Sequence, residues 1–486
     1  MSAETSNVDE RVPLTVAEAA RRLREGSLTA QALLEHSLER IHTLDGEVQA
    51  CVALMEDEAR AAAQAADARL ADTSTARAAS PLLGIPLGVK DLYMTRGVRT
   101  AAGSRVLEDF IPDEDAAAVT RLREAGAALV AKTNTHEFAY GSFTPPTRNP
   151  WDMERIPGGS SGGSAAGIAA GMFPAALGTD TGGSIRIPAA CCGVTGLKPT
   201  YGLVSRAGVI ALSWSYDHAG PLAHTVEDCA LLLDELAGYD PRDPGSIEAP
   251  TLDFTAGLMA RREPAEVARG ARIGVPRQFF FDGAEPEVEA LVRAAIETFK
   301  GLGAEIVDVD MPEELNDDLF DVAYRAVQRP EATLYHTEMG WFPARADRYT
   351  PATRDALSQG AQVLATAYVH AQRVRQALTT KLRALLGSLD ALAMPTLPIV
   401  APRIDALAEP IRLGAGEATV GYATLRNTFP FDLTGQPALA LPCGFTGAGL
   451  PASLQLVAGH FNEPALLRLG HAYQRVTDWH TRQPAF

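Results

Sequence analysis

Short apolar segments alternate with helical patterns along most of this 486-residue chain, and no other feature limits its fold as strongly. Each apolar segment has the length of a buried strand, and the stretches between them carry helical spacing. The expected strands are 85–89, 128–131, 272–275, 304–309, 392–394, 439–442 and 454–457. The expected helices in this part of the chain are 115–125, 286–302 and 463–476. Strands and helices that alternate in this way pack as layers, so the sequence predicts an α/β fold.

The beginning of the chain follows a helical pattern instead. Thr15 and Glu18 stand at the spacing of a capping box, which predicts that a helix begins there. Two further helices are expected at 29–43 and 56–70. We therefore expect a helical N-terminal region at about 1–75.

Two polar stretches rich in proline or glycine, 238–252 and 407–418, are interpreted as loops or insertions. Neither is long enough to divide the chain into separate units. We expect one domain that spans residues 1–486.

Composition narrows the partners and the location. The formal net charge of −17 is the opposite of a basic nucleic-acid footprint, so no direct contact with nucleic acid is expected. Five cysteines without a framework spacing indicate reduced thiols and the cytoplasm. The polar start is unlike a signal peptide, and the small-apolar stretch 165–178 is too short to cross a membrane. We expect a monomer or homodimer with no membrane partner.

The most unusual stretch is the glycine- and serine-rich segment 158–202, GGSSGGSAAGIAAGMFPAALGTDTGGSIRIPAACCGVTGLKPTYG. Its first seven residues resemble a flexible linker. Linkers are not followed by an apolar helix, however, and here the small residues of 165–171 suit close packing against a sheet. We therefore interpret the segment as part of the folded core.

Two motif interpretations fail on single residues. The glycines at 178 and 183 have the spacing of a phosphate-binding loop, but Ser184 stands where that loop needs lysine. His136 and Glu137 begin a zinc-protease motif, but Tyr140 replaces the second histidine. His136 is then a structural or pocket-edge histidine. No cofactor and no metal site are predicted.

A third interpretation stays open on the residues alone. Residues 158–162, GGSSG, fit the GxSxG nucleophile elbow of the α/β-hydrolases, with Ser160 as the nucleophile. That fold also needs an acidic residue and then a histidine downstream. The elbow leaves the second cluster at 178–184, GTDTGGS, without a role.

Taken together, these motifs resemble the amidase signature family. The resemblance covers 82–91 (LLGIPLGVKD), 131–139 (AKTNTHEFA) and nearly all of 157–202. Weaker similarity extends through 394–398, 435–445 and 450–461. The fold that it implies is a mixed, twisted β-sheet sandwiched between α-helices. The activity that it implies is hydrolysis of a carboxylic amide, without a cofactor.

The resemblance also implies three catalytic roles. Ser184 attacks the carbonyl carbon, and Ser160, on a cis peptide bond, passes protons between Ser184 and Lys90. The chemistry is reasonable, because a serine needs a base and burial brings a lysine pKa down to about 7–8. A catalytically inactive relative that only binds ligands is the other class of function, and the presence of all three residues disfavours it.

The remaining roles follow from the same resemblance. The oxyanion hole is formed by the backbone N–H groups of Thr181, Gly182, Gly183 and Ser184, and Ser161 orients Lys90. Asp180 and Arg186 brace the nucleophile turn. The substrate is bound by Asn134, Gly158 and Gly159. A purely structural role for Asp180 and Arg186 is the alternative, and Cys191 and Cys192 are interpreted as packing residues.

Asp91 raises a competing interpretation for Lys90, because an adjacent carboxylate that paired with the lysine would raise its pKa and hinder the mechanism. Neighbouring side chains on a strand point to opposite faces. We therefore expect that Asp91 does not pair with Lys90.

The substrate class divides the family. Free-standing amidases are one branch, and the glutaminase subunit of tRNA-dependent amidotransferases is the alternative. Glutamine-binding members hold the substrate with an acidic residue and an arginine; here Leu425 stands at the acidic position, and Arg354 reaches the arginine position only with a gap. This departure favours a free-standing enzyme for an apolar or aryl amide, anilide or carbamate. Five side chains are candidates for its pocket or for the core: Thr135, Phe138, Tyr140, Phe143 and Trp214.

Overall fold

A computed structural model describes residues 14–72, 79–250, 253–259, 263–414 and 416–486. Its centre is one eleven-stranded sheet in the order β1-β3-β2-β4-β6-β5-β12-β13-β9-β7-β8. The strands are β1 Cys51–Leu54, β2 Pro86–Lys90, β3 Ala128–Thr133, β4 Ala175–Asp180, β5 Thr195–Lys198, β6 His218–Ala223, β7 Arg272–Pro276, β8 Glu305–Val309, β9 Ala391–Pro395, β12 Ala438–Phe445 and β13 Pro451–Val457. The sheet takes strands from both halves of the chain.

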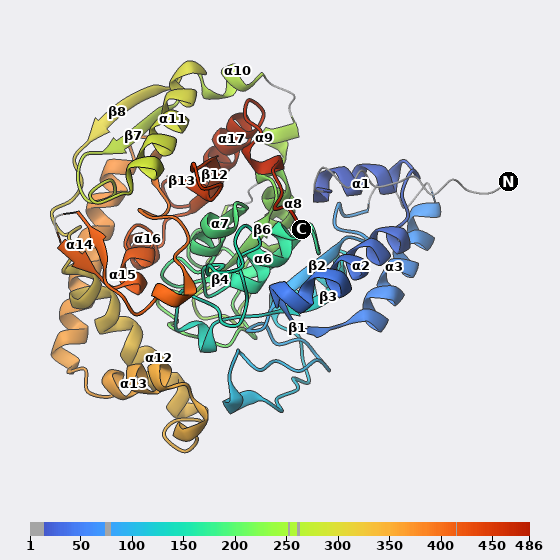
Figure 1. The fold of residues 1–486 in the computed structure, drawn as a ribbon, viewed down its shortest axis with the longest axis horizontal. Coiled ribbons are helices and arrows are strands. Elements are labelled where there is room, and N and C mark those ends of the chain that lie inside the picture. Colours follow the sequence, from blue (N-terminus) through green and yellow to red (C-terminus); the bar gives the residue numbers. More distant parts are fainter. Residues whose placement is uncertain (1–13, 73–78, 251–252, 260–262, 415) are drawn as a thin grey trace.

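Helices lie along both sides of this sheet (Figure 1). The longer helices are α1 Val16–Arg24, α2 Ala30–Val48, α3 Glu56–Ala71, α5 Ala117–Glu124, α6 Gly162–Ala169, α7 Arg186–Cys192, α8 Val226–Leu236, α11 Pro286–Gly301, α12 Ala326–Glu338, α13 Pro351–Gly360, α14 Ala365–Leu386 and α17 Glu463–Gln474. The shorter helices are α9 Ala256–Met259, α10 Pro264–Ala268, α15 Val420–Leu425, α16 Pro430–Thr434 and the π-helical turn η3 Phe320–Arg325.

The pairing of the strands makes the sheet mixed. β3, β2 and β4 run parallel to one another at one end, and β9, β7 and β8 do so at the other end. The pairs between them, from β4·β6 to β13·β9, are antiparallel. The predicted α/β fold with a mixed sheet between helices is confirmed.

The N-terminal helices follow the expected pattern. Thr15 caps α1 by accepting a hydrogen bond from the Glu18 N–H at 3.1 Å, as the capping box predicts. α2 and α3 (blue in Figure 1) lie beside β1 and β3. The short strand β1 between them was not expected, since its four residues give no alternation long enough to read. The single-domain organisation stays a prediction.

The strands that position the site are buried on both faces. Every residue of β2, β3, β4, β5 and β6 is buried. α6 packs against this sheet through small residues, and a Cβ at Gly167 would overlap the ring of Phe173. The small residues of the glycine-rich segment therefore allow a helix to approach the sheet closely, so the segment is core and not a linker.

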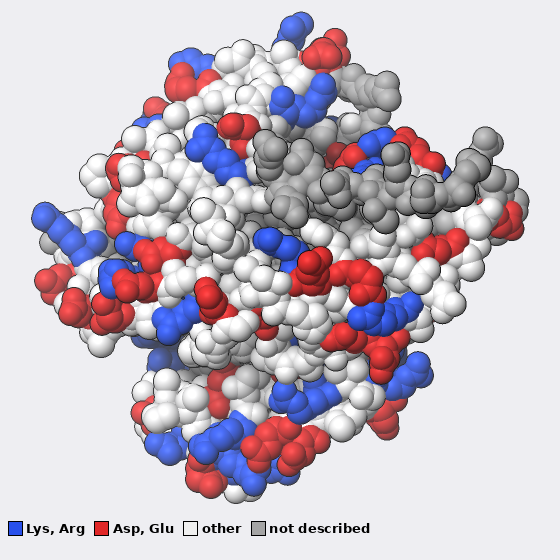
Figure 2. Space-filling view, turned by 45° about the vertical axis from the view of Figure 1, so that its right-hand side comes forward, with Lys and Arg blue, Asp and Glu red and all other residues white. Residues whose placement is uncertain are grey.

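The periphery of the molecule contains a small second sheet and a surface of mixed charge. The stretch 407–418, expected to be a loop or an insertion, contains a two-stranded sheet, β10 Ile411–Leu413 with β11 Gly416–Ala418. On the face drawn in Figure 2, acidic and basic side chains are interspersed. Within the described residues, no helix is long and apolar enough to cross a membrane.

Candidate active site

Lys90 lies at the end of β2 and is fully buried. Its amine lies 2.7 Å from the Ser160 hydroxyl, 2.8 Å from the Ser161 hydroxyl and 2.7 Å from the Thr179 hydroxyl. Burial lowers the pKa of Lys90 well below the ordinary value of 10.5, although the charges of Asp180 and Asp217 oppose this shift. Burial therefore favours loss of the proton from Lys90, whose amine is surrounded by three hydroxyls.

Ser160 and Ser161 form the turn that enters α6. The Gly159–Ser160 peptide bond is cis, as the resemblance implied. The Ser161 N–H donates to the Ser184 carbonyl oxygen at 3.1 Å, which ties this turn to the second cluster. Within the described residues, no hydrogen bond joins the hydroxyls of Ser160 and Ser184. Among the described contacts, the expected bond between Ser160 and Ser184 is therefore absent, and the main-chain bond that links the two clusters comes from Ser161.

Gly158 and Gly159 precede this turn and are closely packed. A Cβ at Gly158 would lie 2.7 Å from the Pro188 Cα, and one at Gly159 would lie 2.7 Å from the Phe143 backbone N. Gly158 also has a φ of +79°, a region that favours glycine. Packing alone therefore requires glycine at both positions, and their role in binding substrate stays a prediction.

The second cluster forms a tight turn after β4. Ser184 is 5% exposed at the end of this turn. The Thr428 hydroxyl donates to the Gly182 carbonyl oxygen at 2.6 Å, and the Thr181 hydroxyl donates to Asp217 at 2.6 Å. Thr428 and Asp217 therefore hold the turn that is predicted to form the oxyanion hole. The sequence analysis identified neither residue.

Asp180 and Arg186 sit on either side of this turn and form a fully buried ion pair, with Nε–Oδ2 and Nη2–Oδ1 both at 3.0 Å. A second buried carboxylate, Asp432, lies 2.6 Å from Nη2. Arg186 also donates to the Thr428 carbonyl oxygen and to Gln455. Burial would raise the pKa of Asp180, but the charge and hydrogen bonds of Arg186 outweigh it and hold that pKa below its ordinary value. Asp432 was not predicted, because no local pattern marks it.

Asp91 does not pair with Lys90. Its carboxylate lies 3.4 Å from the amine of Lys132, and both side chains are buried. Lys132 stands on β3, the strand beside β2. The expectation that Asp91 points away from Lys90 is confirmed, and Lys90 has no carboxylate partner among the contacts of its amine.

Asn134 has protein partners for its side chain. Its Nδ2 donates to the Thr147 hydroxyl at 2.9 Å and to the Pro145 carbonyl oxygen at 3.2 Å, and its Oδ1 accepts from the Thr135 N–H at 2.9 Å. The amide therefore fixes the loop that follows β3. A substrate contact from Asn134 stays a prediction.

Leu425 and Tyr324 form the wall opposite the turn. A Cβ at Gly182 would overlap the Tyr324 hydroxyl and lie 3.0 Å from the Leu425 Cδ2. Leu425 also packs against the small apolar cluster that contains Ile187 and Leu397. Glutamine-binding members are expected to have an acidic residue at this position. Here Leu425 instead makes an apolar contact with the turn. Arg354 is half-buried on α13.

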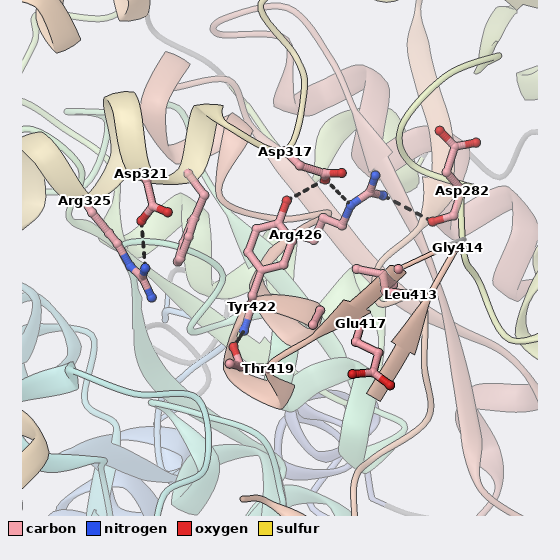
Figure 3. Close-up of a pocket in the computed structure, with 13 residues that line it drawn as sticks. Asp282, Asp317, Asp321, Arg325, Leu413, Gly414, Glu417, Thr419, Tyr422 and Arg426 are labelled. Atoms are coloured by element: carbon pink, nitrogen blue, oxygen red, sulfur yellow. Dashed lines mark hydrogen bonds and ion pairs between the residues drawn. The ribbon is translucent and has the colours of Figure 1, made fainter. Parts of the chain in front are cut away.

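The helix that carries Leu425 is anchored from its other face. Figure 3 shows that Tyr422 of α15 and Arg426, the residue after α15, reach the same carboxylate, Asp317. The Tyr422 hydroxyl donates at 2.7 Å and the Arg426 Nε at 2.9 Å. These residues line an open cavity of about 570 Å³ behind the wall. The anchors fix the register of α15, and with it the side chain of Leu425.

The five aromatic and polar pocket candidates separate into groups. Phe138 is fully buried against the rings of His336 and Trp341, so it belongs to the core. Trp214 is 40% exposed and lines a different cavity of about 570 Å³, together with Tyr201. Thr135 is buried, whereas Tyr140 and Phe143 are half-buried on the loop that approaches Ser160.

The chain is similar to known amidases over nearly its whole length. Residues 32–467 match the family model described as Amidase. A glutamyl-tRNA(Gln) amidotransferase subunit from Roseiflexus sp. (strain RS-1) is 44% identical, over 97% of this chain and 98% of its own. A protein named Amidase from Pseudomonas putida is 43% identical, over 97% of each chain. One solved structure, described for a vestigial protein complex and the evolutionary origins of an s-triazine catabolic enzyme, is 35% identical with a TM-score of 0.87, over 97% of this chain and 100% of that chain. The chain therefore belongs to the amidase signature family of enzymes that act on the C–N bonds of amides.

Proposed function

We propose that this protein hydrolyses a carboxylic amide through an acyl-enzyme on Ser184, with Ser160 and Lys90 as the proton relay. The observation that carries the proposal is the buried amine of Lys90, 2.7 Å from the Ser160 hydroxyl and without a carboxylate partner. A neutral amine at that place accepts a proton, whereas a charged one does not.

The three contacts of the Lys90 amine can be assigned as follows in the neutral state that we propose. A neutral amine has two N–H donors and one lone pair. The Ser161 hydroxyl donates to the Thr179 carbonyl oxygen at 3.2 Å, so its oxygen receives one N–H of Lys90, and the Thr179 hydroxyl receives the other. The lone pair remains for the Ser160 hydroxyl, which then donates to Lys90 and accepts from the nucleophile.

The reaction follows from this direction of hydrogen bonding. Ser184 attacks the carbonyl carbon while its proton passes to Ser160 and the Ser160 proton passes to Lys90. The tetrahedral oxyanion is stabilised by backbone N–H groups of the turn from Thr181 to Ser184. When the C–N bond breaks, Ser160 donates a proton to the leaving nitrogen. Water then releases the acid through the same relay. The hydroxyls of Ser160 and Ser184 approach one another only when substrate is bound, which is common for catalytic hydrogen bonds.

The wall at Leu425 and Tyr324 favours a substrate without a charged group beside the scissile amide. A bound ammonium needs a carboxylate partner in a desolvated pocket, and Leu425 provides none. This favours a free-standing enzyme for an apolar or aryl amide, anilide or carbamate. Asn134, Gly158 and Gly159 remain proposed substrate contacts, with Asp180 and Arg186 bracing the turn.

The names of the relatives favour a second function over the first. This second function is that of the glutaminase subunit of a tRNA-dependent amidotransferase. The 44% identical Roseiflexus protein carries the name of such an amidotransferase, and the similarity covers nearly both chains. The two functions share the Ser184 chemistry and differ in substrate and in the need for partner subunits. A chain of net charge −17 is not suited to contact tRNA by itself. In the alternative function, partner subunits make that contact.

One experiment tests the shared chemistry and separates the two functions. The purified chain is assayed alone with an acyl anilide, an aryl carbamate and glutamine, beside Ser184→Ala. Turnover of the anilide or carbamate that Ser184→Ala abolishes supports the free-standing enzyme. Glutamine turnover that appears only with added partner subunits overturns it. Labelling by a fluorophosphonate that persists in Ser184→Ala but vanishes in Ser160→Ala overturns the assignment of the nucleophile.

The cellular location and the assembly belong to the same proposal. The cysteines of the described residues are free, which suits the cytoplasm. The free-standing function requires only a monomer or homodimer.

A further inference from the structure

Asp217 directly precedes β6, beside the turn that carries Ser184. β4 and β6 run antiparallel, with Asp180 opposite His218. Thr181 follows the first of these residues and Asp217 precedes the second, so the two side chains meet where the strands end. The Thr181 hydroxyl donates to the Asp217 Oδ1 at 2.6 Å.

Asp217 is itself held rigidly. Its carboxylate is 7% exposed and accepts backbone hydrogen bonds from Leu212 at 2.9 Å and from Ser213 at 3.1 Å. The same loop is tied to α12, because the hydroxyls of Ser213 and Ser215 donate to Glu331 at 2.5 and 2.6 Å. A chain of hydrogen bonds therefore connects Thr181 through Asp217 and its loop to a long helix.

Several contacts hold the turn, and Asp217 supplies the one at its first residue. Thr428 holds the Gly182 carbonyl, and Asp180 accepts from the N–H of Ile185 after the turn. Among the described contacts, Asp217 is the partner of the side chain of Thr181, the residue at which the turn leaves β4. The preceding carbonyl oxygen, that of Asp180, lies 3.2 Å from the His218 Nδ1, so this bond and the one from Thr181 fix the start of the turn together.

We infer that Asp217 is a positioning residue for the oxyanion hole, acting through Thr181. The inference rests on the proposed function, since it assigns a purpose to the turn only if Ser184 is the nucleophile. Asp217 acts through the Thr181 hydroxyl and not on the reacting atoms. It fixes the peptide planes of the turn, so that their N–H groups point to where the oxyanion forms. Backbone donors act in this way only when their geometry is fixed before the reaction.

The test measures how fast a fluorophosphonate phosphonylates Ser184 in the full chain, because this probe needs no knowledge of the substrate. We expect Thr181→Val and Asp217→Asn each to slow labelling about 10- to 100-fold, the loss that a displaced catalytic group produces. Thr181→Ser, which keeps the hydroxyl, labels at least about tenfold faster than Thr181→Val. The double variant is no slower than the slower single variant, because both substitutions break one bond.

Ser205→Ala is the matched control. Its hydroxyl is also buried and also donates to a carboxylate, that of Asp240 at 2.8 Å, without contact to the turn. Labelling at the wild-type rate in Thr181→Val, or losses in the two single variants that multiply in the double variant, overturns the inference and leaves the proposed function intact. Absence of Ser184 labelling in the wild type overturns both. If Asp217→Asn does not fold, the Thr181→Val and Thr181→Ser pair decides.

Discussion

The hydroxyl of Thr428 donates to the carbonyl oxygen of Gly182 at 2.6 Å, across 246 residues of sequence. This bond fixes the direction of the Gly182 carbonyl and with it the plane of that peptide. A Cβ at Gly183 would overlap the same hydroxyl, which shows how tightly the two segments meet. The C-terminal part of the chain therefore shapes the turn that carries Ser184.

Removal of this hydroxyl is expected to slow acylation. In Thr428→Val the side chain keeps its volume, but the Gly182 carbonyl loses its donor and the turn is free to rotate. We expect kcat to fall about 10- to 100-fold with little change in KM, because a displaced donor weakens binding of the transition state more than of the substrate. Steady-state kinetics measures this, beside Thr428→Ser as the variant that retains the donor. A rise in KM with unchanged kcat contradicts the role assigned to the bond.

The buried position of Lys90 predicts a pH dependence. Because burial lowers its pKa well below 10.5, the amine loses its proton at a correspondingly lower pH. The neutral amine is the active form, so kcat/KM is present above the pKa in the folded protein and is lost as the pH falls through it. A pH–rate profile measures the rising limb. A limb centred near 10.5 would contradict the assignment.

Lys90→Met tests the same residue directly. We expect a fall in kcat of about 10²–10⁴-fold, the usual contribution of a general base. Lys381→Met is the control, because Lys381 is an exposed lysine paired with Glu313 and Glu314. Equal activity in the two variants would remove Lys90 from the relay.

Leu425 offers a test of specificity. Leu425→Asp places a carboxylate beside Gly182, where it can pair with an ammonium group of a substrate. We expect kcat/KM for glutamine relative to an apolar anilide to rise about tenfold or more, since a hydrogen bond to a charged group contributes about 1.5–3 kcal/mol. Leu425→Asn has the same shape without the charge. If the two variants change the ratio equally, the acidic charge is not what distinguishes the substrates.

The sequence identified those parts of the fold and the site that carry local patterns. The long helices α11 and α17 were readable from apolar spacing, and the capping box at Thr15 marked the start of α1. α14 was within reach of the same method, since its buried Ala371, Leu378, Leu382 and Leu386 stand seven, four and four residues apart.

The central strands β4 and β6 could not be predicted from the sequence, for a physical reason. Their sequences, AALGTD and HAGPLA, contain small residues, glycine and proline, which have low strand propensity. Pairing with neighbours on both sides and cover by helices stabilise them as strands. The same argument applies to the site: Asp217, Thr428 and Asp432 are brought to the turn by the sheet and by α16, and no spacing in the sequence connects them with Ser184.

Arg186 gives a prediction on stability, because its guanidinium contacts the carboxyl groups of Asp180 and Asp432 in the core beneath the turn. Burial raises the pKa of Asp432 well above its ordinary value, and the nearby charge of Asp180 adds to this effect, while Arg186 opposes both. Arg186→Gln leaves the two carboxylates without their cation. We expect the free energy of unfolding to fall by about 3–5 kcal/mol, the cost of removing one partner of a buried ion pair.

Denaturant unfolding, read by the shift of its midpoint, measures this loss. The control is Arg403→Gln, whose guanidinium pairs with Glu154 and Asp405 at the surface and is 42% exposed. Surface pairs of that kind contribute about 0–1 kcal/mol, so the control is expected to unfold close to the wild type. Equal midpoints for the two variants would mean that the buried carboxylates take up protons and remain stable without Arg186. In that case the arginine braces the turn through its hydrogen bonds to the Thr428 carbonyl oxygen and Gln455, and its charge is dispensable.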